Sequence, residues 1–207
     1  FAIEDHYKPR FAGDELPRNQ VGICVALADK LETLVGMFGI GQIPTGDKDP
    51  FALRRHALGV IRMMVEKGLT LKLDDLVRLS TDILEKSDIY SNVSGDAGKS
   101  LGHDARRAIS SLSRRDWNTP ALVDFIYDRL SGNLREQGYG VQEIDAVLSL
   151  RPQQLSDVAK RLIAVRVFSA LPEAAALAAA NKRVGNILKK VEVVVSGKVN
   201  SALLQEA

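Results

Sequence analysis

The chain has 207 residues, of which 45% are hydrophobic and 26% charged, the balance of an ordinary globular protein with one large or two small domains. Its formal net charge of +2 comes from 28 basic and 26 acidic residues and excludes a uniformly basic chain, so any nucleic-acid surface must come from clustering. A single cysteine, Cys24, excludes a disulfide framework and a cysteine-rich zinc site.

Three further features concern where such a chain works. No apolar run approaches the roughly 20 residues that span a bilayer, so we expect no membrane partner. The lone cysteine fits a reducing compartment. The chain opens at Phe1 and no signal peptide is visible, so we expect a middle piece of a longer protein.

The first helix is predicted after an irregular start. Turn signals dominate residues 7–18, and Asn19 is predicted to cap the helix that follows. The glycines in residues 36–41 end it. Its apolar residues recur at spacings of three and four, which predicts one buried stripe: Val21, Cys24, Ala28, Leu31, Leu34, Val35 and Phe38.

Two more helices are predicted before residue 87. Asp49 followed by Pro50 predicts a helix start with an N-cap oxygen, and Gly68 predicts its end. The expected buried residues of this helix are Leu53, Ala57, Leu58, Ile61, Met64 and Val65. Residues 73–86 repeat the pattern with Leu73, Leu76, Val77, Ile83 and Leu84.

The helical pattern weakens in residues 87–118, which we interpret as an internal boundary. Its segment SGDAGKS resembles a phosphate loop, but Val93 stands where that motif needs glycine and no strand precedes it. The segment GMFGIGQ lacks the dinucleotide-binding order and follows a helix, so it is interpreted as a helix stop.

Helical signals return after residue 118. Thr119-Pro120 predicts a helix that ends at Gly138, with Leu122, Val123, Ile126, Leu130 and Leu134 buried. Short helices are expected around Ile144 and over residues 155–165. Pro172 opens the last clear helix, with a stripe of Leu177, Ala180, Val184 and Leu188. The segment VEVVV after Lys190 is β-prone and has no predicted strand to pair with.

Because no segment alternates convincingly at period two, the predicted fold class is all-α, an irregular bundle of about seven helices. This excludes an α/β nucleotide-binding fold.

Basic residues gather in short runs. Arg54-Arg55 follows a predicted helix N-terminus, where backbone N–H groups favour phosphate. Lys182-Arg183 and Lys189-Lys190 lie seven residues apart and share a helix face. Two further runs are Arg106-Arg107 and Arg114-Arg115. Each run is also compatible with an ordinary solvated surface, so phosphate contact stays one of two interpretations.

The histidines leave one metal hypothesis open. His103-Asp104 is the central doublet of the HD phosphohydrolase pattern, in which histidines and aspartates converge on a metal ion. The doublet lies in the polar segment, away from the strongest predicted helices. The chain has only two other histidines, His6 and His56, and a chance His-Asp doublet is an equally simple explanation. Asp14 and Asp29 are the best pair of carboxylates for acid/base chemistry. The plainer interpretations are a turn cap for Asp14 and, for Asp29, an i, i+4 neighbour of Thr33 or a buried hydrogen-bonding helix residue.

Several segments, in order, resemble the beta subunit of the bacterial two-subunit (alpha2beta2-type) glycyl-tRNA synthetase. They are HYKPRFAGDELP (6–17), ALADKLETLVGMFGIGQIPTGDKDPFALRRHALGVIRMMVEK (26–67), FIYDRLSGNLREQGY and IDAVLSLRP (125–152), and ALPEAAALAAANKRVGNILKK (170–190). The segment 26–67 is far more specific than any short motif, and residues 87–118 match least well.

The resemblance implies a division of labour in a cytoplasmic enzyme. The alpha subunit forms glycyl-adenylate from glycine and ATP with Mg²⁺, and the beta subunit mainly holds tRNA(Gly). We therefore expect no cofactor and no catalytic residue in this chain, and as partners the alpha subunit, tRNA(Gly) and other domains of the beta subunit. Residues 1–117 would be an HD-like helical domain. Residues 118–207 would be a helical region leading to the anticodon-binding domain.

On the HD pattern Asp14 and Asp29 would occupy the aspartate positions, with Gly13 in place of the histidine. The resemblance thus implies a degenerate site without metal and a scaffold kept for binding. For tRNA phosphate we expect Arg54 and Arg55 first, then Lys182 and Arg183. The alternatives are an active metal-dependent HD-type phosphohydrolase and a purely structural spacer.

Overall fold

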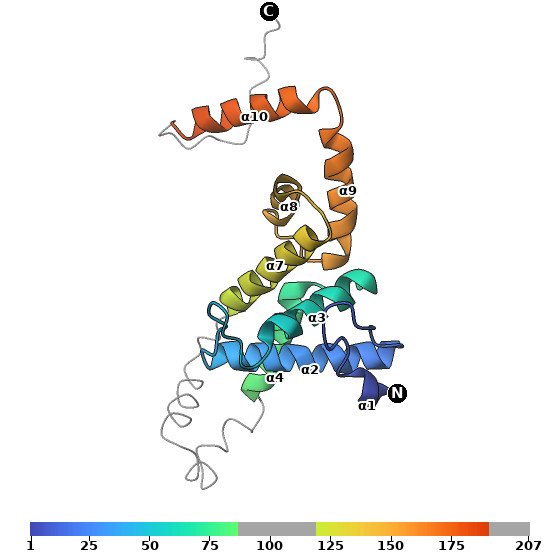
Figure 1. The fold of residues 1–207 in the computed structure, drawn as a ribbon. Helices are drawn as coiled ribbons and strands as arrows, with labels where there is room; N and C mark the ends of the chain where they lie inside the picture. Colours follow the sequence, from blue (N-terminus) through green and yellow to red (C-terminus); the bar gives the residue numbers. More distant parts are fainter. Residues whose placement is uncertain (87–118, 191–207) are drawn as a thin grey trace, which may run out of the picture. The chain divides into compact units, whose positions relative to one another are not determined.

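The computed structural model describes residues 1–86 and 119–190, and every regular element in these ranges is a helix (Figure 1). This confirms the predicted all-α class for the described part of the chain. In order, the elements are α1 (Ala2–Asp5), α2 (Gln20–Gly39), α3 (Leu53–Glu66), α4 (Leu73–Lys86), α7 (Thr119–Glu136), α8 (Val141–Leu148), the 3-10 turn η2 (Leu155–Asp157), α9 (Val158–Ser169) and α10 (Ala174–Leu188).

The chain forms two compact units, Phe1–Val165 and Arg166–Ala207. The predicted division at residue 117 falls outside the described residues, and helices from both sides of it contribute to the core of the first unit. The phosphate-loop-like segment, His103-Asp104, the arginine pairs at 106–107 and 114–115, and the segment VEVVV also lie outside the described residues.

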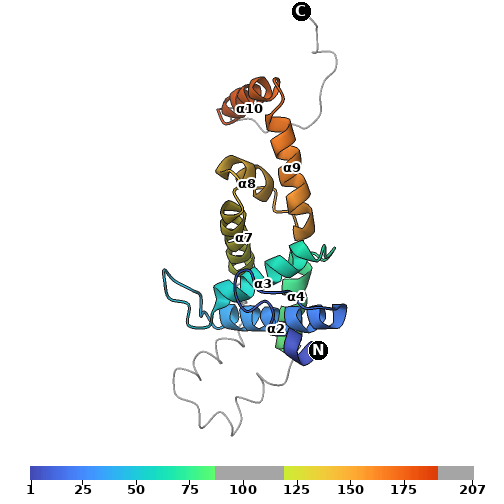
Figure 2. The same cartoon turned by 45° about the vertical axis from the view of Figure 1, so that its right-hand side comes forward.

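Helix α2 is the element around which the first unit is built. It contacts α1, α3, α4 and α7, and Figures 1 and 2 both place α1 beside it. Asn19 caps it as predicted, since its side-chain oxygen accepts a hydrogen bond from the Gly22 backbone N–H at 2.8 Å. Its buried residues are Gly22, Ile23, Ala26, Leu27, Lys30, Leu31, Leu34, Val35 and Phe38.

The predicted stripe of α2 is wrong in its first half. Val21, Cys24 and Ala28 are exposed, and the buried residues in this half of the helix are Gly22, Ile23, Ala26 and Leu27. Apolar residues surround most of this helix, so a spacing of three and four fits more than one face. Packing of its first turns against the N-terminal segment decides between them.

Helix α3 begins at Leu53, three residues later than Pro50 predicted. The Asp49 carboxylate nevertheless caps it, accepting hydrogen bonds from the backbone N–H groups of Leu53 and Arg54 at 2.8 and 3.0 Å. The N-cap residue, Ala52, has a left-handed backbone with φ 54°. Helix α3 ends at Glu66, and Gly68, which was predicted to stop it, follows two residues later with φ 62°.

Helices α4 and α7 to α9 complete the core of the first unit. Helix α4 has the predicted bounds, although Ile83 is exposed where it was expected to be buried. The predicted apolar residues of α7 are all buried. Tyr127 of α7 donates a buried hydrogen bond to the Pro152 carbonyl at 3.1 Å. The backbone carbonyl and side chain of Gln153 accept from the Leu73 and Asp74 N–H groups and so attach this region to the start of α4.

Helix α10 belongs to the second unit, and its expected apolar stripe is exposed there. Leu177 and Val184 expose more than half of their surface, and Leu188 nearly half. In the described ranges no single helix is long and apolar enough to cross a membrane; only residues 155–169 and 174–188 together meet the test of length and composition, across a bend.

Candidate nucleic-acid interface

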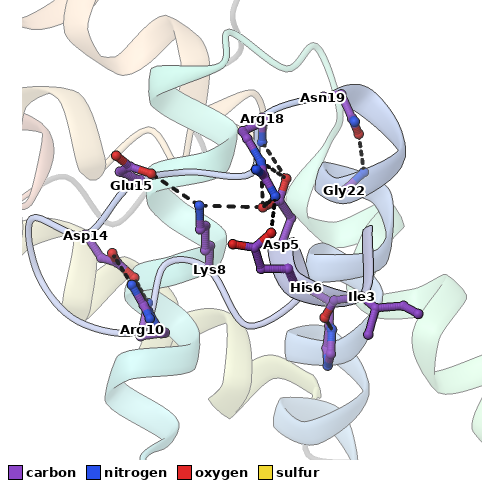
Figure 3. Close-up of polar contacts among 11 residues, drawn as sticks. Ile3, Asp5, His6, Lys8, Arg10, Asp14, Glu15, Arg18, Asn19 and Gly22 are labelled. Carbon is purple, nitrogen blue, oxygen red and sulfur yellow. Dashed lines mark hydrogen bonds and ion pairs between the residues drawn. The ribbon is translucent and has the colours of Figure 1, made fainter. Parts of the chain in front are cut away.

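The N-terminal segment is held in place by a network around Asp5, whose side chain is fully buried (Figure 3). Its carboxylate accepts hydrogen bonds from the backbone and side chain of Arg18 at 3.0 and 3.1 Å. Lys8 lies 3.5 Å from Asp5 and also binds Glu15 at 3.2 Å. The hydrogen bonds from Arg18 are the main cause that holds the pKa of Asp5 well below its usual range.

The loop between Arg10 and Asp14 is closed by a bidentate ion pair, also visible in Figure 3. Arg10 donates from Nε and Nη2 to the two carboxylate oxygens of Asp14, at 2.9 and 3.1 Å, and its backbone N–H donates as well. These bonds lower the pKa of Asp14. Arg62 of α3 donates to the Asp14 carbonyl at 2.8 Å and fixes the loop against α3.

This arrangement gives Asp14 a structural role, as the turn-cap interpretation predicted. Asp29 lies on α2 and lines a different cavity from Asp14. Thr33 does bond to Asp29, but to its backbone carbonyl rather than to its carboxylate. Within residues 1–86 and 119–190, no three histidine, cysteine, aspartate or glutamate side chains are grouped to hold a metal ion.

Arg54 and Arg55 lie in the first turn of α3, as predicted, but their surroundings differ from the prediction. The helix N-terminus that was expected to attract phosphate is already occupied by Asp49. Arg54 donates to the Gly46 carbonyl and so braces the preceding loop. Arg55 is exposed, and its guanidinium has no hydrogen-bond partner in the described residues.

The two arginines line a groove of about 280 Å³ that we call the arginine groove. Arg129 of α7 lies in the same groove, as do Phe11 of the N-terminal loop, Leu58 and Glu136. Among the described residues the buried Nε atom of Arg129 has no hydrogen-bond partner, and its guanidinium lies 5.9 Å from the centre of the Phe125 ring. Phe11 exposes 57% of its surface. The groove thus combines three cations, one acid and an exposed aromatic ring.

Sequence reasoning missed Arg129 and Phe11. Arg129 is an isolated basic residue on α7, where the sequence pattern selected only the apolar residues. The packing of α3 against α7 is what brings it close to Arg54 and Arg55. Lys182 and Arg183 are neighbours on α10 and both are exposed, as expected for that helix face. They belong to the second unit and not to this groove.

The described part of the chain is therefore an all-helical module with an arginine-lined groove and without grouped metal ligands. The family model described as "Glycyl-tRNA synthetase beta subunit" matches residues 1–149, and the chain belongs to this family.

Curated relatives agree over the whole chain. The glycine–tRNA ligase beta subunit of Polaromonas naphthalenivorans (strain CJ2) is 63% identical over 206 residues, 100% of this chain. Those of Janthinobacterium sp. (strain Marseille) and Dechloromonas aromatica (strain RCB) are 60% and 62% identical over 99% and 100% of it. The chain spans 25% of the length of each of these relatives.

Proposed function

We propose that this chain is a tRNA-holding part of a glycine–tRNA ligase beta subunit and that it contacts the phosphate backbone of tRNA(Gly) through the arginine groove. The observation that carries the proposal is the convergence of Arg54, Arg55 and Arg129 from two helices, beside the exposed ring of Phe11. Guanidinium groups suit bidentate contact with phosphate, and an exposed aromatic ring offers a surface on which an unpaired base can stack.

The chemistry of charging is assigned by this proposal to the alpha subunit. Adenylate formation needs charge-stabilising groups that are preorganised around the reacting atoms, whereas the arginines of this chain line a groove. We therefore place ATP and Mg²⁺ elsewhere in a cytoplasmic two-subunit enzyme. This chain contributes a rigid helical surface, and Lys182 and Arg183 of the second unit are proposed as further phosphate contacts.

The test is the salt dependence of tRNA(Gly) binding by the full-length enzyme. Each phosphate contact adds about 0.7–0.9 to the slope of log affinity against log salt. Arg55→Gln and Arg129→Gln should each lower affinity and reduce that slope by about one contact. Arg78→Gln is the matched control, because Arg78 is an exposed arginine of α4 outside the arginine groove. Unchanged slopes in both groove variants would refute the proposed contact.

Two other functions make different predictions. A metal-dependent phosphohydrolase would need ligands that the described residues do not group together, and it predicts a bound metal ion and nucleotide turnover. A structural spacer predicts full charging activity when Arg54, Arg55, Arg129, Lys182 and Arg183 are all neutralised. If the groove variants lose tRNA affinity and the control variant does not, this result supports the proposed function over both the phosphohydrolase and the structural spacer.

A further inference from the structure

A second cavity, of about 180 Å³, shares Arg55 with the arginine groove. Its lining includes Lys30 and Asp29 of α2, His56 of α3 and Tyr7 of the N-terminal segment. Three elements that are distant in the sequence therefore bring potential hydrogen-bond donors to one small space.

Lys30 is the unusual residue of this cavity. It exposes only 3% of its surface, and its ammonium group donates to the backbone carbonyls of His6 and Tyr7 at 3.2 and 3.5 Å. The ammonium group has three N–H bonds but only these two acceptors, so one N–H lacks a partner among the described residues. No carboxylate of the described residues lies within ion-pair distance of it. Burial lowers the pKa of Lys30. Buried cations in proteins are normally paired. Asp29 opposes the effect of burial on Lys30 electrostatically, but from beyond ion-pair distance, so no direct ion pair among the described residues offsets the desolvation.

His56 is a second residue of this cavity with a buried polar atom that lacks a partner. Its Nδ1 atom is buried and has no hydrogen-bond partner among the described residues. Burial, and then the nearby Lys30, lower the pKa of His56, so its ring is neutral at neutral pH. A neutral imidazole carries one N–H and can donate it to an anion.

Gly59 shows that the chain makes room for this lysine. A side-chain carbon added at Gly59 would lie 2.7 and 2.9 Å from Cε and Cδ of Lys30, closer than van der Waals contact allows. Glycine is among the least favourable residues inside a helix, yet it stands here in the middle of α3. The position of the Lys30 ammonium thus depends on the missing side chain at Gly59.

We propose that the cavity around Lys30 and His56 binds a single phosphate group. Lys30 supplies the central charge, His56 a hydrogen bond, and Arg55 a second cation at the cavity that it shares with the arginine groove. Asp29 is the one carboxylate among the described lining residues, so the cations there remain in excess. Donors arriving from two helices suit a tetrahedral oxyanion with several acceptor oxygens.

Two molecules carry this chemistry, an RNA and a mononucleotide. If the phosphate belongs to RNA, the inference rests on the proposed function and adds a specific subsite beside the arginine groove. If it belongs to a mononucleotide, the cavity is a separate ligand site. The experiment below distinguishes these sources as well as testing the site.

The test is equilibrium dialysis of radiolabelled inorganic phosphate against the full-length two-subunit enzyme, compared between wild type and Lys30→Met. Methionine keeps an unbranched apolar stem and removes the charge. We expect the variant to bind one phosphate fewer per chain, or to bind it at least about tenfold more weakly. Lys72→Met, at an exposed lysine, is the matched control and should bind like wild type.

Gly59→Ala provides a second variant that keeps the charge and displaces the ammonium group, and it should weaken phosphate binding in the same direction. If Lys30→Met does not fold, His56→Leu and Gly59→Ala carry the comparison. Equal phosphate binding by wild type and the folded variants, or none by wild type, would overturn the proposal.

Competition identifies the source of the phosphate. Displacement by tRNA(Gly), with weaker tRNA binding by Lys30→Met, assigns the site to RNA. Displacement by adenosine monophosphate but not by tRNA(Gly) assigns it to a mononucleotide. Both results support the site. Arg129→Gln separates this inference from the proposed function, because Arg129 lines the arginine groove and is absent from the described lining of the Lys30 cavity, so its variant tests tRNA binding with this cavity left intact.

Discussion

At the scale of single residues, the Asp14 carboxylate is where charge and stability are most closely linked. Its two oxygens accept three hydrogen bonds from Arg10, which lower the pKa of Asp14 below that of an unfolded chain, about 3.9. A depressed pKa in the folded state stabilises the protein above the unfolded value. That stabilisation is lost as pH falls through the folded value.

We therefore expect stability to fall below about pH 4, because there Asp5 and Asp14 of the unfolded chain bind protons while the folded protein keeps these carboxylates ionised. The lowered pKa of His56 adds a separate loss of stability that begins below about pH 6.5, where the unfolded chain is protonated first. Urea-induced unfolding followed by circular dichroism between pH 7 and pH 2.5 measures this. Asp14→Asn should lower stability at pH 7 and flatten the acid limb, whereas Asp82→Asn, at an exposed position, should leave both unchanged. An acid limb of wild-type steepness in Asp14→Asn would contradict this account.

Asp49 is the second residue whose role is local. It accepts two backbone N–H groups at the start of α3 from outside the helix. Asp49→Ala should destabilise the protein by about 1 kcal/mol, as removal of a helix cap does, and a shifted urea midpoint would report it. Asp47→Ala is the control from the same loop, since Asp47 is exposed and caps no helix in the described residues. Equal midpoints for both variants would show that the cap is unimportant.

At the scale of elements, the prediction from the sequence succeeded where one face of a helix is apolar and the other polar. Helix α4 begins and ends where its pattern begins and ends, and α7 buries all five residues that the spacing selected. Gly68 and Gly138 stop their helices with positive φ, as their positions indicate.

The prediction failed where several faces of a helix satisfy the same spacing. In α2 the residues Ile23 and Ala26 are buried and Cys24 is exposed. The N-terminal segment that packs on the first turns of α2 determines which face is buried. The start of α3 was predicted too early because the Asp49 side chain accepts hydrogen bonds from backbone N–H groups four and five residues later, rather than two or three residues later as an N-cap residue does. Arg129 could not be found from sequence, because its proximity to Arg55 depends on how α3 and α7 pack.

The centre of α2 offers a test of its role in the core. Leu34 is fully buried, so Leu34→Ala should cost about 2–5 kcal/mol, the transfer free energy of the lost atoms plus a cavity term. Leu79→Ala is the matched control, because Leu79 lies on α4 with 56% of its surface exposed and should cost less than about 0.5 kcal/mol. Urea midpoints compare the two, and a small effect at Leu34 would contradict the central place of α2.

For the whole chain, we propose that it holds RNA and that another polypeptide makes the ester bond. The chain provides three groove arginines and the Lys30 cavity on one helical unit, and Lys182 and Arg183 on the other. Charges spread over a rigid surface position a nucleic acid, whereas adenylate formation needs groups that converge on reacting atoms. Variants of this chain should therefore affect tRNA-dependent steps only.

The most direct test compares two reactions of the full-length two-subunit enzyme carrying Arg55→Gln and Arg129→Gln together. Charging of tRNA(Gly) should show a KM for tRNA raised by about tenfold or more, because two phosphate contacts are lost. Glycine-dependent exchange of pyrophosphate into ATP, which needs no tRNA, should keep its wild-type rate. A KM for tRNA equal to that of wild type, or a pyrophosphate exchange rate that falls together with charging, would contradict the account.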